Sequence, residues 1–261
     1  MRALPPSFSP PSHTNPLSPL SPLPTPSNNY TLFVDLGETA YTASIVSFTK
    51  AKLTNLSTHW DRDLGGRDFD HAIATWAADK FVAKYPSAGD PRSKPKSWYK
   101  LCAAAEKAKK TLSPAGVKEA RINIECLMGD YDFNVTLTSD ELATLTSSLL
   151  DRLEAPITRA LAEANLKPSD LARVEIVGGG TRVAAVKRRL AGILDLDTTL
   201  TNNGCGTTMN ADEAVARGCA LMSAILSPRF EVLPYEVIER QINGIRLTWD
   251  DDGAAPPPAP P

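Results

Sequence analysis

The sequence predicts an α/β fold into which a smaller α+β subdomain is inserted, and three observations support this prediction. Short apolar runs near the start of the chain follow one another like the strands of a β-meander. A central block then combines two amphipathic helices with a hairpin. Beyond it, a compact strand runs through three glycines into a helix, which is the strand–loop–helix unit of an α/β layer.

The meander is expected in three short strands, at residues 31–35, 41–48 and 52–57. The inserted block, residues 65–141, begins with a stripe of apolar residues spaced four apart: Phe69, Ile73, Ala77 and Phe81. We expect this first helix over 68–85. A second helix over 98–112 and a hairpin with its turn at 128–130 complete the block.

Thr138 and Glu141 form a T-x-x-E capping box, which predicts that a helix begins there and ends or kinks at Pro156. After it we expect a strand at 174–177, a helix over 183–193, and a last helix over 211–226 that is rich in small residues. Asn210 is the expected N-cap of that last helix.

The two ends of the chain differ in composition from its middle. Residues 1–29 are rich in Pro and Ser, residues 250–261 in Pro, and neither segment has periodic apolar positions. Such segments bury too little apolar surface to offset chain entropy, so we expect both to be disordered, with a globular part at 30–249. A targeting role for 1–29 stays open, because the segment contains no Asp or Glu.

The composition excludes several classes of function. The formal net charge is −2 and basic residues are not clustered, so we expect no nucleic-acid and no membrane partner. Four cysteines without a CxxC pair and three histidines give no pattern for a metal site. We expect the cysteines to be reduced thiols of a cytoplasmic protein, with Cys102 and Cys219 as small core residues.

The first candidate motif is 34–39, VDLGET. Asp35 follows a buried strand and Gly37 opens a tight turn, whose N–H groups could hold a phosphate while the carboxylate positions Mg²⁺-bound water. The alternative is an ordinary hairpin with an Asp near its tip.

The second motif is the triple glycine Gly178, Gly179 and Gly180, followed by Arg182. A strand that passes through glycines into a helix lets a ligand approach the backbone closely. It is neither a Walker A loop nor a GxGxxG fingerprint, and a plain flexible connection is the alternative.

Two further motifs lie on predicted helices. Glu106, Lys109, Lys110 and Ser113 share one helical face, which could contact a sugar and base or simply be solvated. Asp212, in the sequence NADEAVA, lies in the first turn of the last helix, where an acidic residue is favoured in any case.

Together these motifs resemble a known family. In order, VDLGETAYTASIV, GGRDFD, AAAEKAKKTLS, VEIVGGGTRV and NADEAVARGCAL are similar to the second half of the nucleotide-binding domain of 70-kDa heat-shock proteins, over about residues 30–249. The resemblance implies an actin-like, ribonuclease-H-like lobe at 30–64 and 142–226, with 65–141 as its inserted subdomain. Arg67 and the context of Tyr41 look more like the 110-kDa branch.

The resemblance also implies ligands and partners. Asp35 and Gly37 are expected to face phosphate and metal, with Asp212 in the metal-linked network. Glu106, Lys109, Lys110 and Ser113 are expected to face the nucleoside, and Gly178, Gly179, Gly180 and Arg182 the adenine and phosphates. The implied cofactors are ATP or ADP and Mg²⁺. The implied partners are a 70-kDa heat-shock chaperone, on which this branch acts as a nucleotide-exchange factor, and unfolded client proteins, in the cytoplasm or nucleus.

The sequence also departs from the family pattern. Glu38 places a carboxylate beside the expected phosphate, the loop at 201–209 is lengthened, and 227–249 resembles a linker and the start of a truncated β-domain. The family's first lobe is not found before residue 30. We therefore expect a fragment with no catalytic residues of its own and no ATP turnover.

Two other functions stay open at this point. One is an interaction module that grips a partner chaperone through 65–141 without nucleotide. The other is an actin-like sugar kinase or related phosphotransferase, against which the GGRDFD and AEKAKKTLS segments argue.

Overall fold

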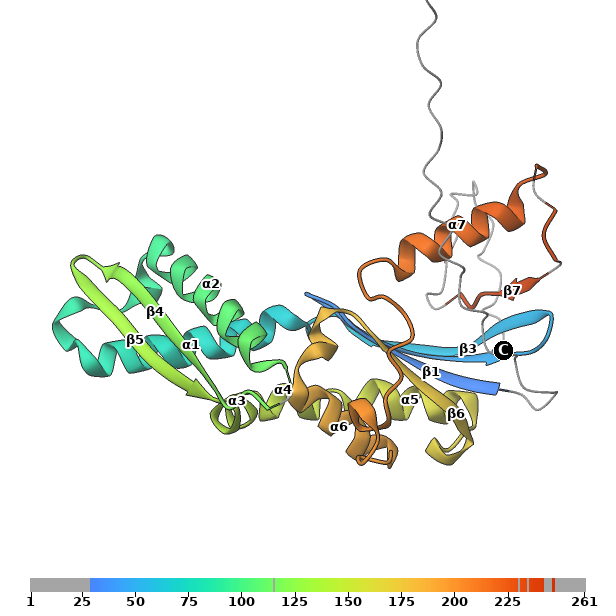
Figure 1. Ribbon diagram of the computed structural model, residues 1–261, viewed down its shortest axis with the longest axis horizontal. Helices are drawn as coiled ribbons and strands as arrows, with labels where there is room; N and C mark the ends of the chain where they lie inside the picture. Colours follow the sequence, from blue (N-terminus) through green and yellow to red (C-terminus); the bar gives the residue numbers. More distant parts are fainter. Residues whose placement is uncertain (1–28, 115, 230, 234, 242–245, 247–261) are drawn as a thin grey trace, which may run out of the picture.

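The computed structural model describes residues 29–114, 116–229, 231–233, 235–241 and 246. The predicted disordered segments 1–29 and 250–261 lie outside them, apart from Asn29. Figure 1 shows two parts along the long axis: a helical and hairpin block at one end and a sheet with its covering helices at the other. The predicted α/β fold is confirmed, because a mixed sheet is covered by helices and a smaller block combines two helices with a hairpin.

The larger sheet has five strands in the order β6-β1-β2-β3-β7. Strands β1, β2 and β3 form the predicted antiparallel meander, whereas β6 pairs parallel to β1 and β7 parallel to β3. Alternate side chains of β1 are buried on one face, as expected for a strand covered on one side. The strands are β1 (Asn29–Leu36), β2 (Tyr41–Phe48), β3 (Lys52–Asp61), β6 (Leu171–Val177) and β7 (Glu236–Ile238).

Two helices cover the buried face of this sheet, α5 (Glu154–Ala164) and α6 (Ala184–Leu194) (Figure 1). Their apolar side chains join those of the strands in one hydrophobic cluster, which includes Leu32, Val34, Ile45, Ile157 and Leu190. Two buried hydrogen bonds fix α5 on the sheet. The Tyr41 hydroxyl donates to the Leu153 carbonyl at 3.1 Å, and the Ser57 hydroxyl donates to the Ala160 carbonyl at 2.8 Å.

A second hydrophobic cluster fills the other end of the molecule. It lies between helices α1 (Gly66–Lys84) and α2 (Pro95–Leu112) and the hairpin of β4 (Glu119–Met128) and β5 (Tyr131–Thr138). The hairpin turn predicted at 128–130 is confirmed, with Met128 as the last residue of β4 and only Gly129 and Asp130 between the strands. The division into a lobe and an inserted subdomain stays a prediction. The separation of the two clusters supports it, although Phe69 of the predicted insert joins the first cluster and Leu142 of the predicted lobe joins the second.

The predicted helix after Thr138 is present but broken. The capping box is confirmed, because the Thr138 hydroxyl accepts from the Glu141 N–H at 3.2 Å and the Glu141 carboxylate accepts from the Thr138 N–H at 3.0 Å. The helix then divides before Pro156, into α3 (Ser139–Leu145), α4 (Ser147–Asp151) and α5. Thr146, fully buried at the first break, donates its hydroxyl to the Leu142 carbonyl at 2.8 Å. Pro156 lies in the first turn of α5, where a missing N–H leaves no helical hydrogen bond unmade.

The last helix, α7 (Ala214–Leu226), begins three residues later than predicted. The Asn210 side chain accepts from the Asp212 N–H at 2.9 Å in a local turn, and Glu213 is the residue before the helix. The prediction that Asn210 caps α7 is therefore wrong. Figure 1 shows α7 on the opposite face of the sheet from α5 and α6, and none of its side chains is buried.

The cysteine predictions are corrected in part. Cys219 lies on α7 and is exposed, so its assignment to the core is wrong. Cys102 is half-buried at the edge of the second cluster, and Cys205 is the buried one. All four thiols are free.

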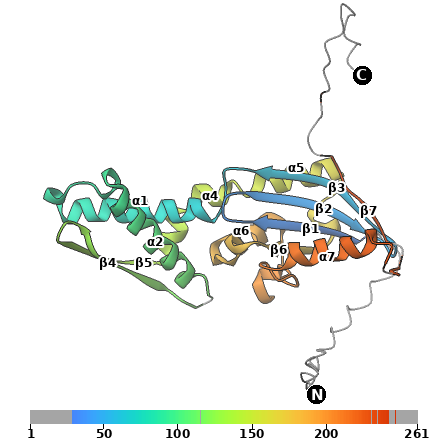
Figure 2. The same cartoon turned by 90° about the horizontal axis from the view of Figure 1, so that it is seen from above.

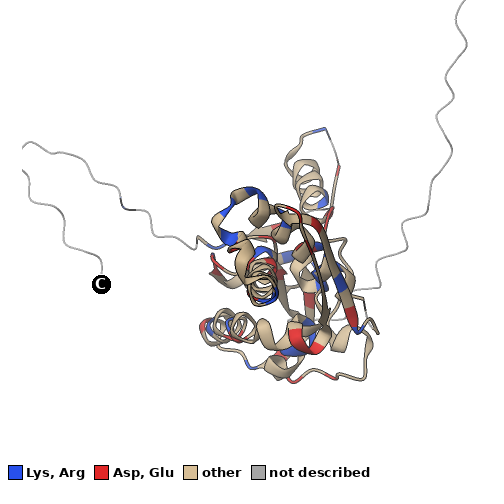
Figure 3. Ribbon diagram, turned by 90° about the vertical axis from the view of Figure 1, so that its left-hand side faces the viewer, with Lys and Arg blue, Asp and Glu red and all other residues tan. Residues whose placement is uncertain are grey.

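Seen from above, the sheet lies between α5 on one side and α7 on the other (Figure 2). Acidic and basic residues are interspersed along the elements, without a face of one sign, in the view onto the helical end (Figure 3). None of the helices within the described residues could serve as a membrane span.

The hydrogen bond from Tyr41 to Leu153 gives a test of how α5 is held. Tyr41→Phe leaves the buried Leu153 carbonyl without its donor, so the free energy of unfolding should fall by about 1–3 kcal/mol. Urea denaturation measures this change. Tyr99→Phe removes the same hydroxyl from a ring that is 75% exposed and should change stability by less than about 0.5 kcal/mol. Equal losses in the two variants would contradict the role given to Tyr41.

Candidate functional site

The turn between β1 and β2 is held by the start of α1. The Gly37 N–H donates to the Ala40 carbonyl at 3.0 Å and closes the turn. The Gly66 N–H donates to the Gly37 carbonyl at 2.8 Å, and the Arg67 N–H to the Glu38 carbonyl at 2.9 Å. A Cβ on Gly65 would lie 2.3 Å from the Glu38 carbonyl oxygen, so glycine is required at this position. The GGRDFD segment therefore docks directly against the VDLGET turn.

The triple-glycine loop lies against the end of β1 from the other side. Gly178 has φ of 86°, and a Cβ there would lie 2.3 Å from the Leu36 carbonyl oxygen and 2.6 Å from Asp35 Oδ1. A Cβ on Gly180 would lie 2.7 Å from Leu36 Cγ, whereas Gly179 has open space around it. Close packing on β1 thus accounts for two of the three glycines, and Gly179 alone presents free backbone surface.

These segments meet because β1 and β6 are parallel. Asp35 and Val177 are register partners, so the carboxyl ends of both strands reach the same edge of the sheet. In open α/β sheets this edge is where ligands bind. Asp35 is exposed there, and desolvation by the surrounding chain raises the pKa of its carboxyl group.

Lys109 lies in the interior, unlike the other charged residues of the predicted face. Its Nζ donates to Asp70 Oδ2 at 2.7 Å and to the Gly66 carbonyl at 2.8 Å. The side chains of Lys109 and Asp70 are only 8% and 10% exposed. Desolvation raises the pKa of Asp70, while the hydrogen bond and charge of Lys109 oppose that rise. This ion pair joins α2 to the start of α1, and through Gly66 to the β1–β2 turn.

The remaining residues of that face are more open. Glu106 and Lys110 form an exposed ion pair at 2.5 Å, which lowers the pKa of Glu106. The Ser113 hydroxyl donates back to the Lys109 carbonyl at 2.9 Å and is half-buried. Glu106, Lys109 and Lys110 lie on α2 and Ser113 is its C-cap, but Lys109 binds the protein while Glu106 and Lys110 face solvent.

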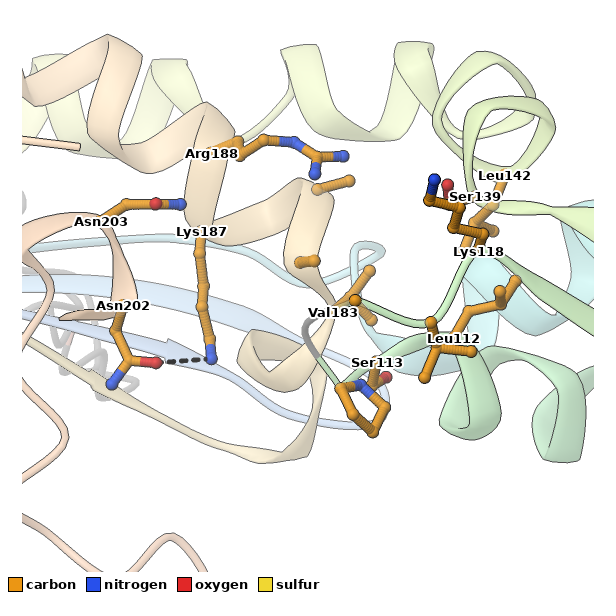
Figure 4. Close-up of a pocket in the computed structure, with 15 residues that line it drawn as sticks. Leu112, Ser113, Lys118, Ser139, Leu142, Val183, Lys187, Arg188, Asn202 and Asn203 are labelled. Carbon is orange, nitrogen blue, oxygen red and sulfur yellow. Dashed lines mark hydrogen bonds between the residues drawn. The ribbon is translucent and has the colours of Figure 1, made fainter. Parts of the chain in front are cut away.

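Arg182 and Asp212 form an exposed ion pair at 3.3 Å, which links the triple-glycine loop to the turn before α7. Ser113 and Val183 line one cavity, so the end of α2 faces the start of α6 (Figure 4). The structure therefore places all four sequence motifs around one edge of the sheet. Whether these residues bind nucleotide stays a prediction.

Asp70 was not among the candidate residues, although it lies within GGRDFD. Its signal is visible in the sequence. An acidic residue seven positions before Ala77 lies on the apolar stripe of α1, and a carboxylate there needs a buried partner.

Removing Lys109 tests the buried pair. Lys109→Met leaves the Asp70 carboxylate buried without its cation, and we expect the free energy of unfolding to fall by about 3–5 kcal/mol in urea denaturation. Adding Asp70→Asn to that variant should recover much of the loss. Lys107→Met, on the exposed side of α2, is the control and should change little. No recovery in the double variant would contradict the pairing.

Comparison with known proteins supports the resemblance to heat-shock proteins found in the sequence. The family described as "Hsp70 protein" matches residues 24–250. The chain is 40% identical over 224 residues to "Heat shock protein hsp88" of Neurospora crassa, covering 86% of this chain and 30% of that relative. It is 38% identical over 229 residues to "97 kDa heat shock protein" of Strongylocentrotus purpuratus, covering 87% and 25%. It is 38% identical over 218 residues to "Heat shock 70 kDa protein 4L" of Homo sapiens, covering 84% and 25%.

The chain thus spans less than a third of the length of these relatives. Within that span, three findings point to one family. These are the order of the sequence motifs, the mixed sheet with its covering helices, and the sequence identities. The chain belongs to the Hsp70 family, on its 110-kDa branch, and has the actin-like fold of that family's ATPase domain.

Proposed function

We propose that this chain is a nucleotide-facing lobe of a 110-kDa-type chaperone, which binds a purine nucleotide weakly and does not hydrolyse it. One observation carries the proposal: the triple-glycine loop and the β1–β2 turn lie at the carboxyl edge of β1 and β6, and Lys109 of α2 is joined to that turn through Gly66. The lobe at 30–64 and 142–226 and the inserted subdomain at 65–141 form the two walls of this site.

The nucleoside would lie against Gly179, where the backbone is open to a flat ring. Glu106 and Lys110 offer an acceptor and a donor for ribose hydroxyls, and Arg182 offers a cation. All three side chains are exposed, so the described residues leave much of a ligand in contact with water. Good pockets bury roughly 70–90% of a ligand's surface, so we expect weak binding here.

Phosphate fits this site less well than the nucleoside does. The Glu38 carboxylate lies at the turn where the phosphate is expected, and its Oε2 is 3.2 Å from the position that a Gly66 Cβ would take. A second carboxylate, Asp35, lies at the end of β1. These negative charges repel a phosphate group, and more strongly in a partly desolvated site than in water.

Family ATPases use ATP or ADP with Mg²⁺. Among the described residues, no group of three or more His, Cys, Asp or Glu side chains could hold a metal ion, so Mg²⁺ would depend on ligands from the nucleotide's phosphates. Asp35 and Asp212 are the residues on this edge that would assist it. The chain's own contribution is to bind and orient the nucleoside.

The biological role proposed for this site is nucleotide exchange on a 70-kDa heat-shock chaperone and retention of unfolded clients, in the cytoplasm or nucleus. The family assignment supports this role, because the relatives are heat-shock proteins by name. A nucleotide-independent interaction module is the alternative, and a phosphotransferase is disfavoured by the family to which the chain belongs.

The first test uses ADP and the melting temperature of the full chain. ADP should raise the melting temperature of the parent chain, and Gly179→Val should abolish that rise, because the added side chain fills the open backbone surface. Gly192→Val is the matched control, since its glycine also has open space but lies on α6 away from this edge. If ADP fails to stabilise the folded parent chain, or stabilises both variants equally, the nucleotide site does not exist and the interaction module is favoured.

The second test asks what Glu38 does. Glu38→Gln removes one negative charge without changing the side chain's size, so calorimetric affinity for ADP should rise several-fold, and relief of about 1.4 kcal/mol of repulsion corresponds to tenfold. Affinity for adenosine, which has no phosphate, should stay the same. Glu125→Gln, exposed on β4, is the control and should alter neither. An equal gain for adenosine and ADP would show that Glu38 does not act on phosphate.

A further inference from the structure

A cavity of about 390 Å³ is lined by residues of both hydrophobic clusters and by cations (Figure 4). One wall comes from the end of α2, the segment leading into β4 and the start of α3, and contributes Lys118 and Ser139. The other comes from α6 and the loop at 201–204, and contributes Lys187, Arg188 and Asn202. Leu112, Leu142 and Val183 supply apolar surface. Its volume is within the range of roughly 300–1,000 Å³ typical of small-molecule sites.

The charges of this cavity are not balanced by acidic residues. None of the described residues that line it is Asp or Glu. Within the described chain, Lys118, Lys187 and Arg188 make no ion pair, whereas the next residue on α6, Arg189, pairs with both Asp151 and Glu154. Lys118 and Arg188 lie on opposite walls, and an anion between these two like charges relieves their repulsion.

Lys187 is positioned without being neutralised. Its Nζ donates to Asn202 Oδ1 at 2.9 Å, and the residue is half-buried. This bond directs Lys187 toward Asn202 and away from Arg188, so its charge adds to the cavity but does not face the same point (Figure 4). Arg188 extends from α6 toward the wall that carries Ser139 (Figure 4). A guanidinium and an ammonium group with a nearby hydroxyl are the donors that phosphate groups take up most readily.

We propose that this cavity binds a small phosphate-bearing organic molecule, with its phosphate between Lys118 and Arg188 beside the Ser139 hydroxyl, and its apolar part on Leu112 and Val183. Because the cations come from both walls, the bound anion connects the α6 side to the β4 side and holds the two clusters in one relative position. This site adjoins the nucleotide site proposed above, since Ser113 lines the cavity, but the charged residues of that site, Glu106, Lys110 and Arg182, do not line it.

Inorganic pyrophosphate is the probe, titrated into the full chain by calorimetry and by melting temperature. We expect saturable binding and a rise in melting temperature of a few degrees, beyond that given by NaCl of the same ionic strength. Arg188→Gln should weaken pyrophosphate binding about tenfold or more. The matched control is Arg159→Gln, which removes the same charge from an exposed position on α5 and should leave the affinity unchanged.

Lys118→Gln changes an exposed residue on the opposite wall and keeps the test decisive if Arg188→Gln fails to fold. It should weaken pyrophosphate binding several-fold, because it removes a cation from the other side of the anion. Binding that NaCl reproduces, or equal losses in the pocket and control variants, overturns the proposal. Gly179→Val should leave pyrophosphate binding intact, so a failure of this site and a failure of the nucleotide site give different results.

Discussion

The buried ion pair between Lys109 and Asp70 determines how the two ends of the molecule meet. Each partner is almost fully withdrawn from water, and Lys109 also holds the Gly66 carbonyl. Gly66 in turn holds the β1–β2 turn through its N–H. Replacing such a pair by apolar side chains of similar volume is often no less stable in proteins, so its value here lies in fixing geometry. It sets α1, α2 and the turn in one position relative to the sheet.

Glycine packing fixes the other side of the same edge. Gly178 and Gly180 let the loop after β6 lie on Leu36, and the parallel pairing of β1 and β6 keeps both strand ends level. Together with the ion pair, this leaves Gly179 and the exposed face of α2 around one edge of the sheet. The proposed weak nucleotide site is thus a by-product of contacts that also build the fold. Its exposed side chains can change with little loss of stability, whereas a change of Gly178, or of Lys109 or Asp70 alone, is costly.

Elements governed by local chemistry could be predicted from the sequence. The meander follows from alternating apolar residues, the hairpin turn from Gly129-Asp130, and the start of α3 from the Thr138 capping box. The break at Thr146 could not be predicted, because it depends on burial of that side chain against other elements. Likewise, the sequence predicts one charged helical face for Glu106, Lys109 and Lys110. Only the fold shows that Lys109 differs from the other two, because its partner Asp70 lies on a different helix. The cavity between α2 and α6 had no signal in sequence, since its walls come from segments about seventy residues apart.

The strand pairing of the large sheet has a kinetic consequence. Strand β1 finds β2 and β3 next to it in sequence, but its other neighbour, β6, follows only after the whole helical and hairpin block. That block draws its own hydrophobic cluster from a continuous stretch of chain, so it closes short loops and gains contacts early. Joining β6 to β1 closes a much longer loop, which slows the step that completes the sheet. The edge at which the candidate site lies is therefore expected to be the last part of the molecule to form during folding and among the first to open when the chain is destabilised.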